Sequence, residues 1–248
     1  NKWGYFPSIA FAWTASNEKF MEPYRDIVNH LKLRASYGVI GNQDIAPYST
    51  LALMSQTTTY FGSNTGVTGY WENTLATPDI KWEKTNQFDI GFDLGLWNNR
   101  LTLSLDYFDK RTTDALLSTR LPNYLGNAGE VSNRGLDFAI SANVFSTNDF
   151  DWSTSINGTY LKNKVVKLTA QEPRLYSGVM PGICDDGTNI ITEGEAIGSF
   201  YGYRWAGIDT DGYDTYYTAD GSVTRSPDPT TDRVVLGRSS PDFTLGGN

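Results

Sequence analysis

The sequence predicts an all-β fold: an antiparallel transmembrane β-barrel segment with long loops on one side and short turns on the other. Three observations lead to this prediction: side chains that alternate between apolar and polar, connections that alternate in length, and aromatic residues near both strand ends. The clearest alternation runs from Thr85 to Lys110 and reads as two strands joined by the turn 97–100. A period of two gives each strand one apolar and one polar face. About ten residues suffice to cross a bilayer at a tilt.

The alternation predicts eight strands, each paired with its neighbour in sequence. Seven are placed at residues 5–15, 31–40, 83–96, 101–112, 131–146, 151–166 and 198–208, and the eighth begins near Asp242. The apolar side chains expected to face lipid are Phe88, Ile90, Phe92, Leu94, Leu101, Leu103, Leu105, Phe138 and Ile140. The polar side chains expected to face the lumen are Asp89, Asp93, Ser104, Asp106, Asp137 and Asn143. A barrel wall places one such set on each side.

The connections between the predicted strands alternate in length. The short ones are 17–30, 97–100 and 146–151, and the long ones are 41–81, 113–130 and 167–197. Outer-membrane barrels have short periplasmic turns and long extracellular loops, so the long group is expected outside the cell. The connection 209–241 is an exception, because it is long and falls on the short side. Residues 22–30 are expected to add a short helical turn.

Aromatic residues make up 14% of the chain and fall at two heights along the predicted strands. Near the short turns lie Trp13, Trp97, Phe145, Trp152 and Trp205, and toward the opposite edge lie Tyr37, Trp82, Tyr107, Tyr160 and Tyr201. Amphipathic rings prefer the two lipid–water boundaries of a membrane. The alternative is that the same rings form the core of a soluble β-sandwich, a carbohydrate-binding module. The loop lengths and the two belts favour the membrane.

Composition narrows the possible functions. The net charge of -8 and the pI of about 4.7 argue against a nucleic-acid partner, whose phosphates require a basic surface. No run approaches the roughly 18 consecutive apolar residues of a membrane helix. Cys184 is the only cysteine, which excludes an internal disulfide or a multi-cysteine metal site. Both ends of the chain fall inside predicted strands without a signal peptide, so a fragment of a larger protein is expected.

No residue pattern points to catalysis, a cofactor or a metal. His30 is the only histidine, and it is expected in a turn just before a strand. The segment from Asp209 to Asp214 is similar to a calcium-binding loop, in which alternating carboxylates surround a cation. Its twelfth position holds Asp220 where that motif closes with Glu, so a plain turn is the favoured interpretation. The chain is therefore not expected to be an enzyme.

An ordered set of short motifs runs from one end of the chain to the other. They are Trp3-Gly4-Tyr5-Phe6-Pro7-Ser8, Leu31-Lys32-Leu33-Arg34-Ala35-Ser36-Tyr37-Gly38, Gly41-Asn42, Trp82-Glu83-Lys84-Thr85-Asn86-Gln87, Gly91-Phe92-Asp93, Asn133-Arg134-Gly135-Leu136-Asp137, Gly198-Ser199-Phe200-Tyr201-Gly202-Tyr203, Gly207-Ile208, Asp232-Arg233, Gly237, Pro241-Asp242-Phe243 and Gly246. In this order they resemble the C-terminal barrel region of SusC/RagA-type TonB-dependent outer-membrane transporters.

The resemblance implies a larger barrel of 22 strands with an N-terminal plug, located in the bacterial outer membrane and energised by a TonB complex. It also implies a SusD-like surface lipoprotein as partner and import of glycans or peptides. No plug or TonB box is recognisable in the sequence. Residues 1–248 are therefore expected to be one partial TonB-dependent receptor-like barrel domain, surrounded by outer-membrane lipid, with the TonB complex acting through N-terminal parts outside this chain.

The long loops contain the candidate ligand-binding residues. Flat rings with hydrogen-bonding neighbours suit both sugar faces and peptide side chains. The residues selected on this ground are Tyr60, Tyr70, Trp71, Arg174 and Tyr176, with Tyr70 and Trp71 as the first choices. The alternative for each ring is that it fixes its loop or belongs to the upper aromatic belt.

Overall fold

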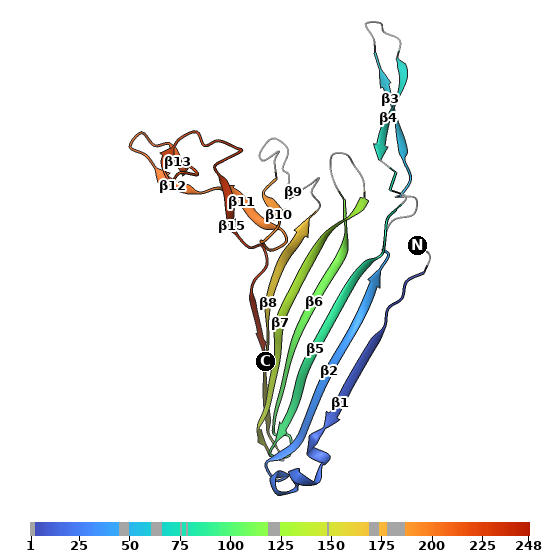
Figure 1. Ribbon diagram of the computed structural model, residues 1–248. Helices are drawn as coiled ribbons and strands as arrows, with labels where there is room; N and C mark the ends of the chain where they lie inside the picture. Colours follow the sequence, from blue (N-terminus) through green and yellow to red (C-terminus); the bar gives the residue numbers. More distant parts are fainter. Residues whose placement is uncertain are drawn as a thin grey trace.

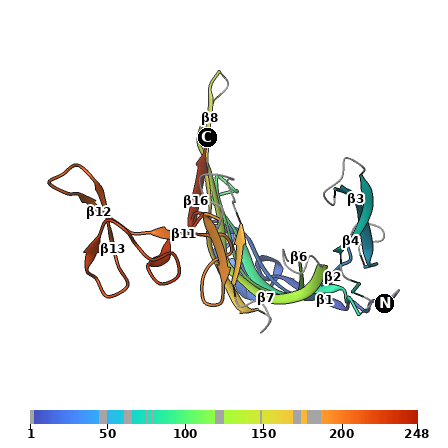
Figure 2. The ribbon, with the colours of Figure 1, turned by 90° about the horizontal axis from the view of Figure 1, so that it is seen from above.

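A computed structural model of the chain describes residues 3–44, 50–60, 66–74, 76–77, 79–118, 125–147, 149–168, 174–177 and 187–248. Within these residues the chain is all-β apart from short 3-10 helices, and it forms one seven-stranded sheet and three smaller sheets. The large sheet curves into an arc when seen from above (Figure 2). The small sheets gather at one end of the long strands (Figure 1). This is the architecture of a barrel wall segment.

The main sheet is antiparallel throughout and has the order β1-β2-β5-β6-β7-β8-β16. Its strands are β1 (Ser8–Thr14), β2 (Val28–Asn42), β5 (Glu83–Leu96), β6 (Leu101–Ser118), β7 (Leu125–Ser146), β8 (Asp151–Leu168) and β16 (Phe243–Gly247). The first six predicted strands are confirmed, and β5 has the predicted bounds. β6 and β7 run further than predicted, so most of the expected loop 113–130 is strand.

The other elements lie at the two ends of this sheet. At one end are the sheets β3 (Leu53–Thr59) with β4 (Val67–Thr74), β9 (Arg174–Ser177) with β10 (Asn189–Thr192), β11 (Ser199–Tyr203) and β15 (Arg233–Gly237), and β12 (Trp205–Ile208) with β13 (Asp214–Tyr217) and β14 (Val223–Thr224). We call residues 53–60 and 67–74, which include β3 and β4, the hairpin arm, and residues 174–177 and 187–237 the insert module. At the other end lie the 3-10 helices η1 (Ala15–Asn17) and η2 (Lys19–Tyr24).

Two expectations about these elements are corrected. The helical turn predicted for 22–30 lies earlier, in η2, and His30 belongs to strand β2 instead of a turn. None of the helices among the described residues has the length and apolar character needed to cross a membrane.

The predicted barrel strand 198–208 is wrong. These residues form β11 and β12 of the insert module, while β8 pairs directly with β16, where Tyr160 faces Phe243. Short strands of a separate sheet have the same period of two as a membrane strand, so alternation alone does not distinguish them. Tyr201 and Trp205 consequently do not belong to the aromatic belts. The exception at 209–241 also disappears, since the whole connection between β8 and β16 lies on the long side.

The short connections are held by local hydrogen bonds. The β5–β6 turn places Trp97, Asn98 and Asn99 in the left-handed region, with φ of 52°, 57° and 60°. Asn tolerates this conformation better than most residues. Asn98 bonds the start of β2, because its backbone N–H and its side chain both bond Asn29. The Trp97 N–H donates to Ile27 O (2.9 Å) in the connection that precedes β2. Adjacent short turns are thus joined at this end of the sheet.

The two predicted side-chain sets lie on opposite faces of the main sheet. Cross-strand partners share a face, and the row Phe92, Leu105 and Phe138 is apolar while the next row, Asp93 with Ser104, is polar. The apolar face is exposed, with Ile90 at 49% and Leu245 at 64%. Among the described residues no second sheet covers it. The β-sandwich alternative is therefore wrong, because it requires the apolar rows to be sealed between two sheets.

Buried apolar side chains concentrate where the insert module meets β8. Val165, Leu168, Ile190 and Ala196 are at most 5% exposed. The segment before β11 lies along the upper part of β8, where Val165 N–H donates to Glu195 O (2.8 Å) and Gly194 N–H donates to Val165 O (2.9 Å). This small core fixes the module to the end of the barrel strand.

Candidate functional site

The polar face of the main sheet carries a network centred on Arg34 of β2. Its Nη2 donates to Asp93 Oδ1 (2.9 Å), Asp106 Oδ2 (3.0 Å) and Ser104 Oγ (3.3 Å). Ser104 Oγ donates in turn to Asp93 Oδ1 (2.9 Å). The polar residues that the alternation placed on one face therefore meet in space. Two carboxylates share one guanidinium, and Lys32 lies beside Asp93 in the same cross-strand row.

Space for this network depends on Gly91, which lies between Arg34 and Asp106 in the cross-strand row. A Cβ at Gly91 would come within 2.0 Å of Asp106 Oδ1 and 2.7 Å of the Leu105 carbonyl. Beside it is a cavity of about 270 Å³ that also touches Ala10, Ala12 and Asp89. The small side chains of β1 leave this hollow open next to the charged groups.

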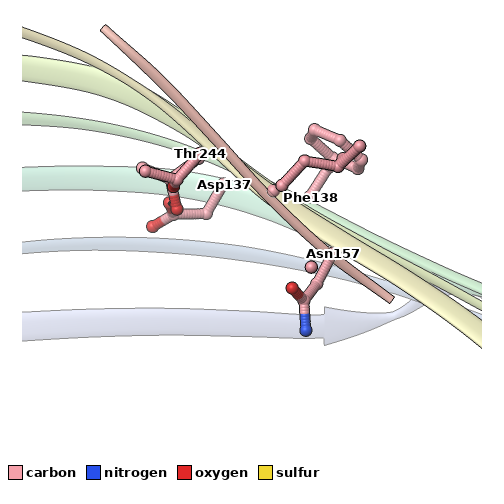
Figure 3. Close-up of a pocket in the computed structure, with 8 residues that line it drawn as sticks. Asp137, Phe138, Asn157 and Thr244 are labelled. Atoms are coloured by element: carbon pink, nitrogen blue, oxygen red, sulfur yellow. Dashed lines mark hydrogen bonds between the residues drawn. The ribbon is translucent and has the colours of Figure 1, made fainter. Parts of the chain in front are cut away.

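A second cavity, of about 530 Å³, lies on β7, β8 and β16 (Figure 3). Asp137 and Thr244 lie on one side of the sheet and Phe138 on the other. Thr159 Oγ1 donates to Asp137 Oδ1 (2.7 Å), which holds the carboxylate in place. On the apolar side, Phe138 stacks on Phe243 with ring centroids 6.3 Å apart. The polar side of this cavity is thus lined by hydroxyl, carboxylate and amide groups.

The hairpin arm projects beyond the main sheet (Figure 1) and carries three of the five predicted ligand residues. Tyr60, Tyr70 and Trp71 are exposed at 64%, 67% and 54%. In the register of the arm, Trp71 pairs with Ser55 and Tyr70 pairs with Gln56. Neighbouring residues of a strand point to opposite faces, so the arm presents Tyr70 on one face and Trp71 on the other. One flat ligand cannot stack on both.

The base of the arm is fixed by residues from the motifs at 3–8, 41–42 and 82–87. The Phe6 ring lies 5.2 Å from the Trp82 ring and covers Gly41, where a Cβ would come within 2.0 Å of Phe6 Cζ. Asn127 Oδ1 accepts from Lys81 N–H (2.7 Å), and its Nδ2 donates to Lys81 O (2.9 Å). These contacts hold the returning end of the loop against the barrel rim.

The other two predicted residues lie on β9, at the edge of the insert module. Arg174 and Tyr176 are exposed, and the Tyr176 ring lies 5.8 Å from the Tyr201 ring. The Arg233 guanidinium lies 4.7 Å from the Tyr201 centroid and donates to Gly187 O (2.6 Å). Sequence reasoning missed Tyr201 and Arg233 as members of this surface, because Tyr201 was assigned to a barrel strand. The structure brings Arg174 and Tyr176 together on β9, but it places Tyr60, Tyr70 and Trp71 on a separate element.

The calcium-like segment folds as a turn around an arginine. The Arg225 guanidinium bonds the carboxylates of Asp209 and Asp211 and lies 4.7 Å from the Tyr213 ring. The hydrogen bond from the Tyr213 N–H contributes most to lowering the pKa of Asp209 below its usual range, and the Arg225 guanidinium lowers it further. Across the described ranges, no three His, Cys, Asp or Glu side chains gather to hold a metal ion. Cys184 lies outside the described residues.

Comparison with known proteins identifies the family. Residues 1–245 match the family described as TonB dependent receptor-like, beta-barrel. The chain therefore belongs to this family of outer-membrane receptors and transporters.

Individual relatives cover the same barrel region. TonB-dependent receptor P3 of Formosa agariphila is 37% identical over 271 residues, which cover 100% of this chain and 26% of that protein. TonB-dependent receptor SusC of Bacteroides thetaiotaomicron is 31% identical over 218 residues, which cover 82% of this chain and 22% of SusC. A solved structure of the RagAB peptide transporter aligns with a TM-score of 0.79 at 26% identity, covering 98% of this chain and 27% of that one. The chain thus spans about a quarter of the length of these relatives.

Proposed function

We propose that residues 1–248 form a partial barrel domain of a TonB-dependent outer-membrane importer. The observation that carries this proposal is the main sheet, in which long antiparallel strands have one exposed apolar face and one polar face. All of its long connections leave from one end. The apolar face is assigned to lipid and the polar face to the lumen, since an uncovered apolar face on long antiparallel strands is favourable in a membrane.

The height of the apolar face supports the assignment to lipid. On β8 the outward side chains run from Trp152 to Tyr160, which is eight residue steps or about 27 Å along a strand. A tilt of roughly 35–45° reduces this to about 20 Å along the barrel axis, near the height of a transmembrane apolar band. Trp152 stacks on Phe145 at the lower limit, with ring centroids 6.0 Å apart. Tyr107 and Tyr160 lie at the upper limit, as an aromatic belt requires.

The proposed cargo is an oligosaccharide or a peptide. The SusC/RagA resemblance implies both classes, and one similar solved structure is that of a peptide transporter. The proposed contacts are Tyr60, Tyr70 and Trp71 on the hairpin arm and Arg174 and Tyr176 on the insert module. Both elements lie at the end of the sheet assigned to the cell exterior. Exposed rings beside hydrogen-bonding groups fit either sugar faces or peptide side chains.

The proposed partners follow from the same orientation. A SusD-like surface lipoprotein would meet the hairpin arm and the insert module, which are the elements that project beyond the barrel wall. A TonB complex would act through parts of the protein outside this chain. Neither catalysis nor a cofactor is proposed.

Fractionation of cells that express the full-length protein tests the proposal. We expect the protein in the outer membrane and soluble only after detergent is added. A variant that lacks residues 60–75 should still assemble but should import less substrate. Extraction of the wild-type protein without detergent would contradict the membrane assignment. Unchanged uptake and partner binding in the deletion variant would contradict only the role of the arm.

A further inference from the structure

The apolar face of the main sheet ends abruptly at one height. On β6 the outward side chains are Leu101, Leu103, Leu105 and Tyr107, and the next two are Asp109 and Arg111. On β8 the outward Tyr160 is followed by Lys162 and Lys164. Arg134 of β7 pairs across the sheet with both Asp109 and Lys162, so these charges lie in one row. The change from apolar to charged therefore occurs within about 7 Å along each strand.

Above this limit the outward face is strongly basic. We call the outward cations of this region the basic collar. They are Lys84, Arg111, Arg134, Lys162, Lys164 and Lys167. The outward carboxylates among them are Asp109, which pairs with Arg134 Nε (3.0 Å), and Glu130, which pairs with Arg111. Six cations against two carboxylates leave a surplus of four positive charges. This surplus stands out because the whole chain has a net charge of -8.

The surplus resides on lysines that are free to reach a ligand. Lys84, Lys162, Lys164 and Lys167 are exposed. They form no ion pair with any other described residue. Glu130 lies opposite Lys167 in the register and bonds Arg111, which places Lys167 on the same outward side. Each lysine has a long flexible stem that can lower its ammonium toward the boundary of the apolar band.

We infer that the basic collar binds the phosphate groups of lipid headgroups in the surrounding outer leaflet. This inference rests on the proposed membrane orientation. Headgroup phosphates lie immediately above the hydrocarbon region, which is where the collar begins relative to Tyr107 and Tyr160. Clusters of Lys and Arg next to a membrane-spanning segment attract anionic headgroups. The collar thus continues the lipid-facing surface upward with complementary charge.

The collar is distinct from the surfaces assigned to cargo. The Arg34 network lies on the opposite face of the sheet, and Arg174 and Tyr176 lie on the insert module. An acidic protein partner is the competing occupant of a basic surface. The collar's position against the apolar band, over four adjacent strands and just above two tyrosines, favours lipid.

Native mass spectrometry of the full-length protein in detergent tests the inference, with diphosphoryl lipid A and its dephosphorylated form as probes. We expect the wild-type protein to retain the diphosphoryl form preferentially. The double variant K162Q/K164Q should lose about tenfold or more of that binding. The matched control K32Q/K110Q removes two cations from the polar face and should bind lipid A as the wild type does.

The outcomes separate this inference from the proposed function. Equal retention of the two lipid forms by the wild type, or unchanged binding by K162Q/K164Q, would overturn the collar as a phosphate site. Loss of a copurifying protein with normal lipid A binding would identify a protein interface and would likewise overturn it. Membrane integration is measured separately by the requirement for detergent. A protein that needs detergent but fails the lipid A test contradicts only the collar.

Discussion

The main sheet and the insert module are stabilised by different kinds of contact. The sheet has strands of up to 22 residues, and its apolar side chains remain exposed on one face. The module has strands of two to five residues, held by local carboxylate contacts, ring contacts and a small core against β8. The sheet therefore depends on a surrounding that covers its apolar face, whereas the module carries much of its own support.

This difference shows where sequence changes are expected to matter. On the sheet, a charged side chain on the apolar face should impair assembly in the membrane, because the apolar side chains there pack against lipid. On the module and the hairpin arm, changes act on local order or on recognition. Single substitutions on the two regions separate these two behaviours.

Replacing Leu103 by Arg should have the largest effect. The side chain lies in the middle of the apolar band, between Leu94 and Ile140 in its cross-strand row. An arginine at this depth costs about 2–4 kcal/mol. The measurement is the folded fraction of the full-length barrel across a denaturant series in lipid. The matched control is Thr102→Arg on the polar face, and equal losses in both variants would erase the distinction between the faces.

Replacing Trp71 by Ala should reduce substrate uptake by about tenfold while the barrel assembles normally. Loss of a central aromatic contact typically costs more than 1 kcal/mol of binding. Tyr70→Ala is the companion variant, which tests the proposed contact on the other face of the arm. Because the two rings point in opposite directions, only one variant should lower substrate affinity if the ligand occupies one face. Equal and additive losses of substrate affinity in the two variants would show that both faces of the arm are contacted, as by a partner protein that surrounds the arm.

Replacing Arg34 by Gln should destabilise the barrel by about 1 kcal/mol, since partly exposed ion pairs contribute little. The change leaves Asp93 and Asp106 close together without their shared cation. Adding Asp93→Asn should restore part of the loss by removing the repulsion. Denaturant midpoints of the single and double variants measure this coupling, and additive effects would contradict the network.

The smallest expected effect concerns a turn of the insert module. Hydrogen bonds from the Thr218 hydroxyl, and then from the Ser222 amide, lower the pKa of Asp220 to about 2. Because the pKa is lowered, the ionised Asp220 carboxylate stabilises the turn fully above the ordinary Asp pKa of about 3.9. This stabilisation is lost as the pH falls through about 2. The protection factor of the turn amides, which is the exchange rate relative to the intrinsic rate at each pH, should therefore be constant from pH 7 to pH 4. Asp220→Ala should raise exchange in this turn severalfold at neutral pH and leave the main sheet unchanged.

The sequence predicted the main sheet well because its long strands obey one rule. β5 was placed with its observed bounds, and the apolar and polar sets fall on opposite faces as predicted. The β8–β16 pairing was not predictable, because the connection between these strands is long and contains strands of its own. The motif Gly198-Ser199-Phe200-Tyr201-Gly202-Tyr203 alternates like a barrel strand, although it belongs to another sheet.

The candidate site was less accessible to sequence reasoning. Tyr70 and Trp71 were chosen as exposed loop rings, and only the pairing of β3 with β4 shows that they occupy opposite faces. The basic collar was also missed, since its charges come from four strands that are distant in sequence. Once the strand registers are known, its rows follow directly from the period of two.

The assignment of the apolar face to lipid is tested most directly by a spin-label scan of residues 101–107 in the full-length protein in lipid vesicles, with Cys184 replaced by Ser. Each residue is changed in turn to Cys and labelled, and its collision rates with oxygen and with a water-soluble nickel complex are measured. We expect a period of two: labels at 101, 103, 105 and 107 meet oxygen in lipid, and labels at 102, 104 and 106 meet nickel in water. Equal nickel access along the whole strand, or the reverse alternation, would contradict the assignment of the apolar face to the membrane.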